Sequence, residues 1–150
     1  MGDSKELFHR AIKLLKLRLG VIKCKSSFYV SPPWGFQHEN NFINQAVKLN
    51  TVLQPNEILK NCLEIEQKLG RERISSDDYQ ARTIDIDILL FNTETINFRD
   101  LIIPHQHLHN RRFALLPLEE IAPDLIHPKF DRTIRQLLYS CKDNSDVIKL

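Results

Sequence analysis

The run Arg82-Thr83-Ile84-Asp85-Ile86-Asp87-Ile88-Leu89-Leu90-Phe91 decides the fold, because strongly β-forming residues alternate here with two carboxylates. Side chains along a strand point to opposite faces in turn, so Asp85 and Asp87 share one face and the isoleucines the other. The run therefore predicts a strand with its two carboxylates roughly 7 Å apart. Such carboxylates repel one another, and Mg²⁺ takes oxygen ligands of this kind while leaving room for phosphate. A half-solvated strand with an acidic outer face is the alternative.

Arginines flank this strand on both sides, at positions 71, 73, 82, 111 and 112. Guanidinium groups bind the oxygens that gain charge as a phosphoryl group moves, and carboxylate-held Mg²⁺ orients the polyphosphate. The four glycines form neither a Walker A motif nor a dinucleotide fingerprint. The sequence thus favours phosphate chemistry that depends on side chains and metal. For Arg111 and Arg112 the alternative is a solvated basic patch.

Composition narrows the function further. A chain of 150 residues, 42% hydrophobic and 27% charged, predicts a single domain with one core. The net charge of +2 is small and therefore indicates neither nucleic acid nor an anionic membrane as a partner. Cys24, Cys62 and Cys141 are widely spaced and indicate reduced thiols. With no secretory h-region and no membrane-length apolar run, we expect a cytoplasmic protein, and we expect it to be a monomer.

Periodicity and turn residues place the elements. Helices are predicted over 4–18 and 55–70, ending at Gly20 and Gly70, and a short one over 133–139. Strands are predicted over 21–30 and 42–49, the second antiparallel to the first, and over 101–103. Residues 74–81 read as a surface loop, 92–97 as a turn, 117–128 as a packed stretch and the last residues as frayed. This order predicts an α+β fold, an antiparallel sheet with helices on one face.

The run Gln80-Ala81-Arg82-Thr83-Ile84-Asp85-Ile86-Asp87-Ile88-Leu89-Leu90 resembles the signature of the 6-hydroxymethyl-7,8-dihydropterin pyrophosphokinases. Four further stretches agree with that family in the same order: 26–29 with 32–35, 42–44, 65–66 with 69–73, and 103–105 with 110–113. Together they cover almost the whole chain. The resemblance implies a ferredoxin-like fold. It also implies transfer of a diphosphate from ATP to the pterin alcohol, giving AMP and the pterin diphosphate, a step of folate biosynthesis.

The resemblance also implies roles for individual residues. Asp85 and Asp87 match the ligands of two Mg²⁺ ions that bridge the ATP phosphates. The catalytic arginines are Arg71 and Arg82, and the contacts to ATP are Glu66, Arg73, His105 and Arg111. The residues that meet the pterin are Ser31, Trp34, Phe42, Asn44 and Phe113. In this set the two phenylalanine rings stack on the flat heterocycle, and the amide of Asn44 pairs with its polar edge.

The chain departs from the family pattern at two places. Tyr79-Gln80-Ala81 stands where the family usually has Trp and Gly-Pro. Family members begin with a β-strand and a Gly-Ser-Asn turn, whereas this chain opens at Met1-Gly2-Asp3. We therefore expect that the sequence begins at an internal methionine and lacks the first strand of the sheet.

Three other interpretations remain open on the sequence alone. The chain could be a ferredoxin-like module that binds RNA or a nucleotide without turnover, although Asp85 and Asp87 would repel a phosphate backbone in the absence of metal. It could also be an inactive relative of the enzyme. Finally, His105, His107 and His109 alternate and could bind zinc, although the family match already explains His105.

Overall fold

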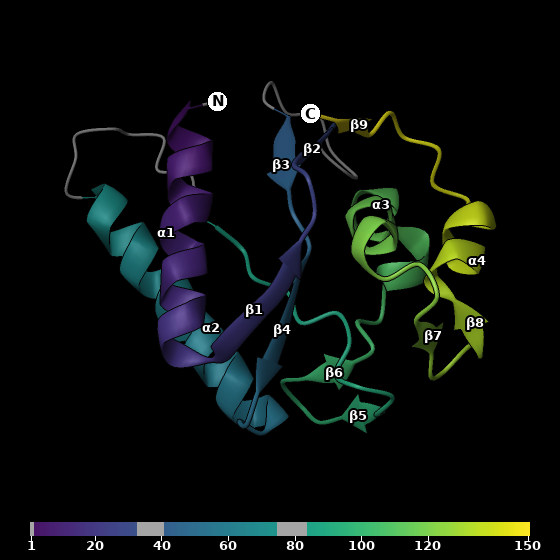
Figure 1. Cartoon of the computed structure of the whole chain (residues 1–150), viewed down its shortest axis with the longest axis horizontal. Coiled ribbons are helices and arrows are strands. Elements are labelled where there is room, and N and C mark those ends of the chain that lie inside the picture. Colours follow the sequence, from purple (N-terminus) through teal and green to yellow (C-terminus); the bar gives the residue numbers. More distant parts are fainter. Residues whose placement is uncertain (1, 33–40, 75–83) are drawn as a thin grey trace. The chain divides into compact units, whose positions relative to one another are not determined.

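The computed structural model describes residues 2–32, 41–74 and 84–150 (Figure 1). Its contacts divide the chain into two compact units, Met1–Ile22 with Leu49–Ile88 and Lys23–Lys48 with Leu89–Leu150. The boundary falls within strands β1 (Gly20–Lys25) and β4 (Val47–Thr51), which pair with each other. Because both units share these strands, the single domain expected from the sequence stays a prediction. The predicted loop over 74–81 lies almost wholly outside the described residues.

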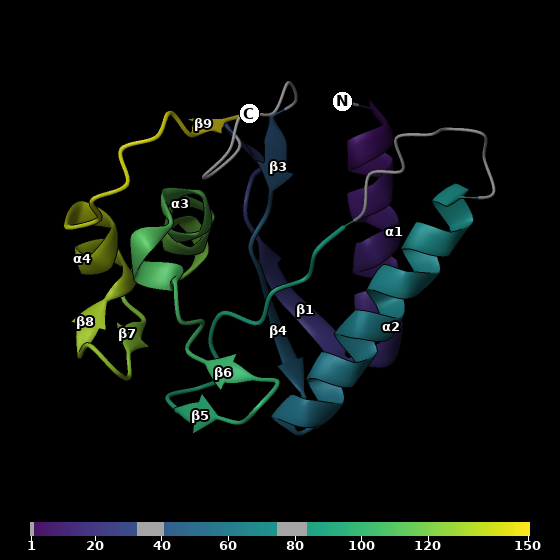
Figure 2. The ribbon, with the colours of Figure 1, turned by 180° about the vertical axis from the view of Figure 1, so that it is seen from behind.

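Two long helices make up most of the first unit. Helix α1 (Gly2–Arg18) and helix α2 (Pro55–Ile74) pack side by side, as Figures 1 and 2 both show. Their buried side chains recur at helical spacing: Leu7, Ala11 and Leu15 on the first helix, Ile58, Cys62, Ile65 and Leu69 on the second. Arg18 and Glu64 form an ion pair across them. Both predicted helices are confirmed.

The predicted end of the second helix at Gly70 is wrong, because α2 continues to Ile74. Glycine ends a helix when it takes the left-handed conformation, and Gly70 does not take it. Inside a helix, glycine weakens the element without stopping it. Leu69, which is 1% exposed, anchors the helix at this point through tertiary packing.

At position 20, in contrast, the structure does require a glycine. Its φ is +149°, and a Cβ there would overlap the backbone carbonyl oxygen of Asn50 on the paired strand. We expect Gly20→Ala to lower the free energy of unfolding by about 2–4 kcal/mol, through backbone strain and steric overlap. Gly70→Ala is the matched control, because nothing lies within 4 Å of the added Cβ. It should raise stability by about 0.5–1 kcal/mol. Urea titrations in which both variants shift in the same direction would contradict this assignment.

A three-stranded antiparallel sheet in the second unit carries several of the expected site residues. Its order is β3 (Phe42–Asn44), β2 (Tyr29–Ser31) and β9 (Ile148–Lys149). Ser31 pairs with Phe42 and Tyr29 with Asn44, which confirms the predicted antiparallel pairing. The expectation of a frayed chain end is wrong, since β9 pairs with β2 and Leu150 N donates to the Phe28 carbonyl oxygen at 2.9 Å.

Each of the two long predicted strands is interrupted. Residues 26–28 separate β1 from β2, and residues 45–46 separate β3 from β4. At this break Ala46 N donates to Ser26 Oγ at 2.9 Å, and Ser27 N donates to Glu120 Oε2 at 2.8 Å. Side-chain acceptors of this kind compete with the ladder for backbone donors, which is why the strands stop here.

The core of the second unit lies among its helices. Helix α3 (Arg112–Ile121), helix α4 (Ile134–Tyr139) and the 3₁₀ turn η1 (Leu108–Asn110) bury one apolar cluster. Its members are Leu108, Leu115, Leu118, Ile134 and Leu137, with Leu89 and Leu90 packed against it. The capping box of Thr133 and Gln136 starts α4, which confirms the predicted terminal helix. Helix α3 was not expected, because Pro117 in its interior disfavours a helix.

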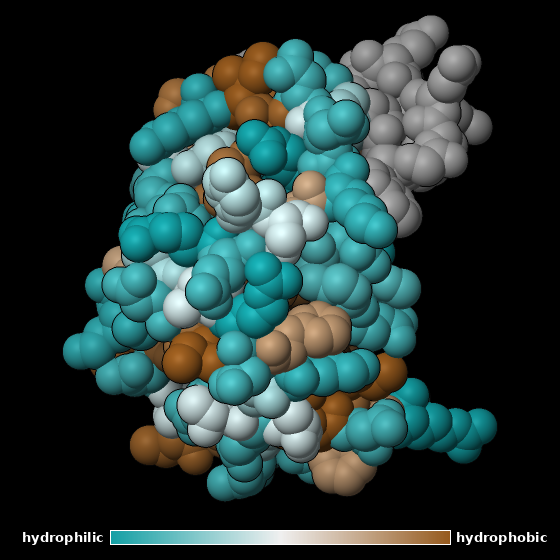
Figure 3. All heavy atoms as spheres, turned by 90° about the vertical axis from the view of Figure 1, so that its right-hand side faces the viewer, coloured by the Kyte–Doolittle hydropathy of each residue, from teal (hydrophilic) through white to brown (hydrophobic). Residues whose placement is uncertain are grey.

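Short strands complete this unit. Strand β5 (Ile96–Asn97) pairs with β6 (Ile102–Ile103), which confirms that the predicted strand over 101–103 exists. Strand β7 (Ile126–His127) pairs with β8 (Arg132–Thr133). The face in Figure 3 is mostly hydrophilic, with apolar side chains scattered over it. Among the described helices, none is long and apolar enough to cross a membrane.

The acidic run, residues 82–91 with Asp85 and Asp87, does not have the predicted secondary structure. Residues 84–91 form neither helix nor strand, so the strand expected over 82–91 is wrong for its described part. No described strand forms a ladder with this segment, and its backbone bonds go elsewhere: Ile86 N donates to Glu66 Oε1, and His105 N donates to the Leu89 carbonyl oxygen. The predicted alternation nevertheless holds, because residues 84, 86 and 88 are half-buried while Asp85 and Asp87 are exposed.

Candidate active site

Three carboxylates come together in the first unit. Glu66 projects from α2, and its Oε1 accepts a hydrogen bond of 2.6 Å from Ile86 N. Because Ile86 lies between Asp85 and Asp87, this bond holds the short piece of backbone from which both aspartates project. The arrangement ties the acidic run to the helix even though the run has no ladder.

The carboxylates of Glu66, Asp85 and Asp87 also interact electrostatically. Burial raises the pKa of Glu66, and the negative charges of Asp85 and Asp87 raise it further, against the opposing effect of the Ile86 hydrogen bond. A bound divalent cation would relieve this repulsion, and carboxylate oxygens are the ligands that Mg²⁺ prefers. The described residues contain no group of three such side chains already arranged as a metal site. The fit to a cation therefore rests on the donor chemistry and on the hydrogen bond that ties the Asp85–Asp87 backbone to Glu66.

The expected catalytic arginines are placed in part. Arg71 and Arg73 belong to the last turns of α2, where the structure describes their backbone and not their side chains. Arg82 and Trp34 lie outside the described residues altogether. The roles assigned to these four residues stay predictions.

The described part of the second unit contains four of the five residues expected to meet the pterin: Ser31, Phe42, Asn44 and Phe113. Ser31, 2% exposed at the end of β2, accepts a hydrogen bond of 3.1 Å from Asn44 Nδ2 on β3. This bond fixes the plane of the Asn44 amide and thus the direction of its carbonyl oxygen. Phe42 lies opposite Ser31 in the strand register, and 46% of its surface is exposed. A flat ligand could therefore reach both the ring and the amide from the same sheet.

Phe113 lies in the first turn of α3, which packs against both β2 and β3. The packing brings the helix that carries Phe113 against the strands that carry Ser31, Phe42 and Asn44. The guanidinium carbon of Arg111 lies 5.7 Å from the centre of the Phe113 ring, within the range of a cation–π contact. Arg111 and Phe113, assigned to different substrates, are thus neighbours in space.

The three alternating histidines have different environments. The Nδ1 atom of His105 accepts a hydrogen bond of 3.2 Å from His107 N. The ring of His109 packs edge-on against Phe130 at 4.6 Å, and burial, with smaller effects of Lys129 and His107, lowers its pKa. Within the described part of the chain these imidazoles form no metal-binding group, so the zinc alternative finds no support there.

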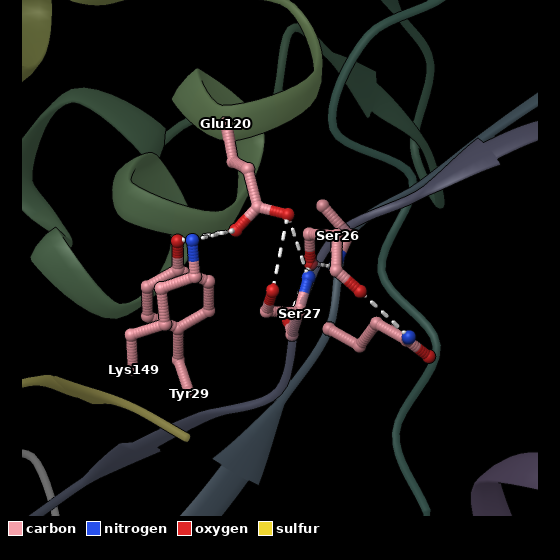
Figure 4. Close-up of polar contacts among 7 residues, drawn as sticks. Ser26, Ser27, Tyr29, Glu120 and Lys149 are labelled. Carbon is pink, nitrogen blue, oxygen red and sulfur yellow. Dashed lines mark hydrogen bonds and ion pairs between the residues drawn. The ribbon is translucent and has the colours of Figure 1, made fainter.

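Glu120 is a residue that the sequence reasoning missed. Its carboxylate accepts hydrogen bonds from Tyr29 Oη at 2.7 Å and Ser27 N at 2.8 Å, and it pairs with Lys149 Nζ at 3.4 Å (Figure 4). Burial alone would raise the pKa of Glu120, but these donors outweigh burial and lower it. No local pattern could have indicated the group, because Glu120 lies more than 90 residues from Ser27 and Tyr29 in the sequence.

Comparison with known protein families identifies the family of this chain. Residues 1–123 match the family described as 7,8-dihydro-6-hydroxymethylpterin-pyrophosphokinase (HPPK). The chain belongs to this family. The matched range includes every residue that the sequence assigned to metal, ATP or pterin.

Individual pyrophosphokinases resemble the chain over most of its length. The 2-amino-4-hydroxy-6-hydroxymethyldihydropteridine pyrophosphokinase of Haemophilus influenzae is 38% identical over 146 residues, covering 97% of this chain and 89% of the relative. The enzyme of the same name from Bacillus subtilis is 40% identical over 123 residues, covering 81% of this chain and 72% of the relative.

The fold also matches a solved structure. A crystal structure of an HPPK-DHPS in complex with substrates superposes with a TM-score of 0.71 at 19% sequence identity. The match covers 89% of this chain and 40% of that longer chain. It confirms the predicted α+β, ferredoxin-like fold class.

Membership in the HPPK family settles the class of activity. The chain is a pyrophosphokinase of folate biosynthesis, which transfers a pyrophosphoryl group from ATP to hydroxymethyldihydropterin. The predicted enzyme is confirmed, and the module that binds RNA without turnover finds no support in the family match.

Proposed function

We propose that Asp85 and Asp87 hold two Mg²⁺ ions and, with Glu66 behind them, form the nucleotide side of the HPPK active site. The observation that supports this proposal is the hydrogen bond from Ile86 N to Glu66 Oε1, which ties the backbone between Asp85 and Asp87 to a third carboxylate. When bound, the ions would neutralise the phosphate oxygens of ATP. Glu66 contributes by holding the Ile86 amide and thus the spacing of the two aspartates.

Arginine side chains would supply further positive charge to the phosphates of ATP. We assign Arg71 and Arg82 to the phosphoryl oxygens that gain charge during transfer, and Arg73, His105 and Arg111 to ATP. A guanidinium group suits the first task because it stays charged and donates two parallel hydrogen bonds. His105 suits a contact to ATP, because an imidazole can donate or accept hydrogen bonds with the polar groups of a nucleotide.

The pterin side follows from the sheet of the second unit. A reduced pterin is flat, uncharged and polar at its edge, so stacked rings and a fixed amide recognise it. We assign stacking to Phe42 and Phe113 and edge recognition to Asn44. Ser31 orients the amide of Asn44, and Trp34 belongs to the same site on the family pattern alone. We also propose that the protein is cytoplasmic and monomeric. Sedimentation analysis tests the monomeric state.

Metal removal tests the proposal as a whole. AMP release from ATP should require the pterin alcohol and Mg²⁺ together, and a chelator should abolish it, because the proposed arginines act on phosphates that the metal ions orient and partly neutralise. Restoring Mg²⁺ should restore the rate. AMP release that persists in the chelator, with both substrates present, would show that the carboxylates do not act through a metal ion.

Phe113→Ala tests the pterin side separately. Loss of stacking and burial should weaken pterin binding by roughly 1–3 kcal/mol, with ATP affinity nearly unchanged. Calorimetry with each substrate measures both effects. Phe98→Ala serves as the control, because Phe98 is 64% exposed and lies on the short β5–β6 hairpin. An equal loss for ATP and pterin would make Phe113 a structural residue.

A further inference from the structure

The helix that carries Phe113 cannot cap its own start. The first four N–H groups of a helix need acceptors from outside it, and the N-cap side chain usually supplies one. In α3 the N-cap residue is Arg111, whose guanidinium group has donors and no acceptor. That guanidinium instead lies over the Phe113 ring.

Asp143, from the end of the chain, supplies the missing acceptor. Its Oδ2 accepts a hydrogen bond of 3.0 Å from Arg112 N, the first residue of α3. Its Oδ1 accepts one of 3.0 Å from Ser145 N, so both carboxylate oxygens are held in place. Burial by itself raises the pKa of Asp143, but the bonds from Ser145 and Arg112 outweigh burial and hold the pKa below its usual range. The acceptor is therefore charged at neutral pH, which suits the N-terminus of a helix.

The same segment of chain reaches the other end of α3. Strand β9 pairs with β2, and Lys149 on it binds Glu120, which lies one residue before the end of the helix. Figure 4 shows the Glu120 carboxylate pointing from the helix toward Lys149, Tyr29 and Ser27. Residues 143–150 thus hold α3 at both ends and extend the sheet that carries Ser31 and Asn44.

We propose that residues 143–150 act as a brace for pterin binding, in which Asp143 is a positioning residue that sets the first turn of α3 and thereby the ring of Phe113. Phe113 directly follows the residue whose amide Asp143 holds, so a shift of this turn moves the ring. The family model matches residues 1–123 and therefore does not include the brace. The inference rests on the proposed role of Phe113 in pterin binding.

A double-mutant cycle on pterin binding tests this brace. Calorimetry with the pterin alcohol, at saturating concentration of an ATP analogue that cannot react, is carried out on Asp143→Ala, Phe113→Ala and the double variant. Asp143→Ala should weaken pterin binding roughly fivefold, because the first turn of α3, once uncapped, must be ordered on binding at about the cost of a helix cap, and it should leave ATP affinity within twofold. Because Asp143 acts through Phe113, its effect should vanish in the Phe113→Ala background.

Two further variants control for charge and for folding. Asp100→Ala removes the same charge from an exposed position of the same unit, outside residues 143–150, and should leave pterin binding unchanged. Asp143→Asn keeps an oxygen acceptor for Arg112 N, and should restore most of the affinity. If Asp143→Ala yields no folded protein, Asp143→Asn takes its place in the cycle, where its smaller loss must again vanish without Phe113.

The outcomes separate the two proposals. If Phe113→Ala weakens pterin binding and the losses are additive, the brace is wrong and the role of Phe113 stands. If Phe113→Ala leaves pterin binding unchanged, the proposed pterin site is wrong and the brace fails with it. Equal loss of ATP and pterin affinity in Asp143→Ala also overturns the proposal, because it marks Asp143 as a general structural residue.

Discussion

Asp87→Asn is expected to lower the rate of pyrophosphoryl transfer by roughly 10³-fold or more, because charge stabilisation supplies most of the catalysis in such reactions. The two side chains have nearly the same shape, so the change removes a charge and little else. Asp87 is exposed, and the temperature of unfolding should therefore hardly change. Asp85→Asn should behave in the same way.

The pKa of Glu66 also provides a measurement on the three carboxylates that does not depend on turnover. The charge of Asp87 raises the pKa of Glu66, so Asp87→Asn should lower the pKa of Glu66 toward its ordinary value. Titration by nuclear magnetic resonance measures this shift without substrate. Asp100→Asn is the control, because Asp100 is exposed and is not among the carboxylates that raise the pKa of Glu66, so it should change neither quantity. Turnover of Asp87→Asn within tenfold of the parent would rule out the two-metal proposal.

Arg82→Ala is expected to have the second-largest effect, a fall in turnover of roughly 10³-fold with a much smaller loss of ATP affinity. A guanidinium group that meets the transferring phosphoryl group stabilises charge that develops in the transition state, so its removal affects kcat more than binding. Steady-state kinetics combined with direct measurement of ATP binding separates the two quantities.

Two variants sharpen this experiment. Arg82→Lys keeps the charge but loses the paired donors, and should recover only part of the rate. Arg99→Ala removes an exposed arginine from the second unit and should leave the kinetics unchanged. If Arg82→Ala keeps its turnover and loses ATP affinity alone, Arg82 contacts the ground state and the catalytic assignment moves to Arg71.

Much of the local structure could be predicted because its causes are local. Apolar residues at helical spacing predict α1 and α2, since one face of a helix must be buried. The short helix predicted over 133–139 is likewise local, because its start depends on a capping box of two residues in the same turn, Thr133 and Gln136. The alternation of Asp85 and Asp87 with isoleucines predicts which side chains are exposed, and the structure keeps that alternation. The family motifs belong to the same class of local information.

Where partners are distant in the sequence, the tertiary structure decided the outcome. Residues 84–91 have strong β propensity and yet form no strand among the described residues, because a strand needs a neighbour as well as a propensity. Ile148 and Lys149 follow a polar stretch and yet form a strand, because β2 offers them an open edge. Ser26 and Glu120 interrupt predicted strands by taking backbone donors. The sequence alone thus determined the family, the helices α1, α2 and α4 and the exposed aspartates, whereas helix α3 and the contacts that hold its two ends depend on hydrogen bonds between residues that only folding brings together.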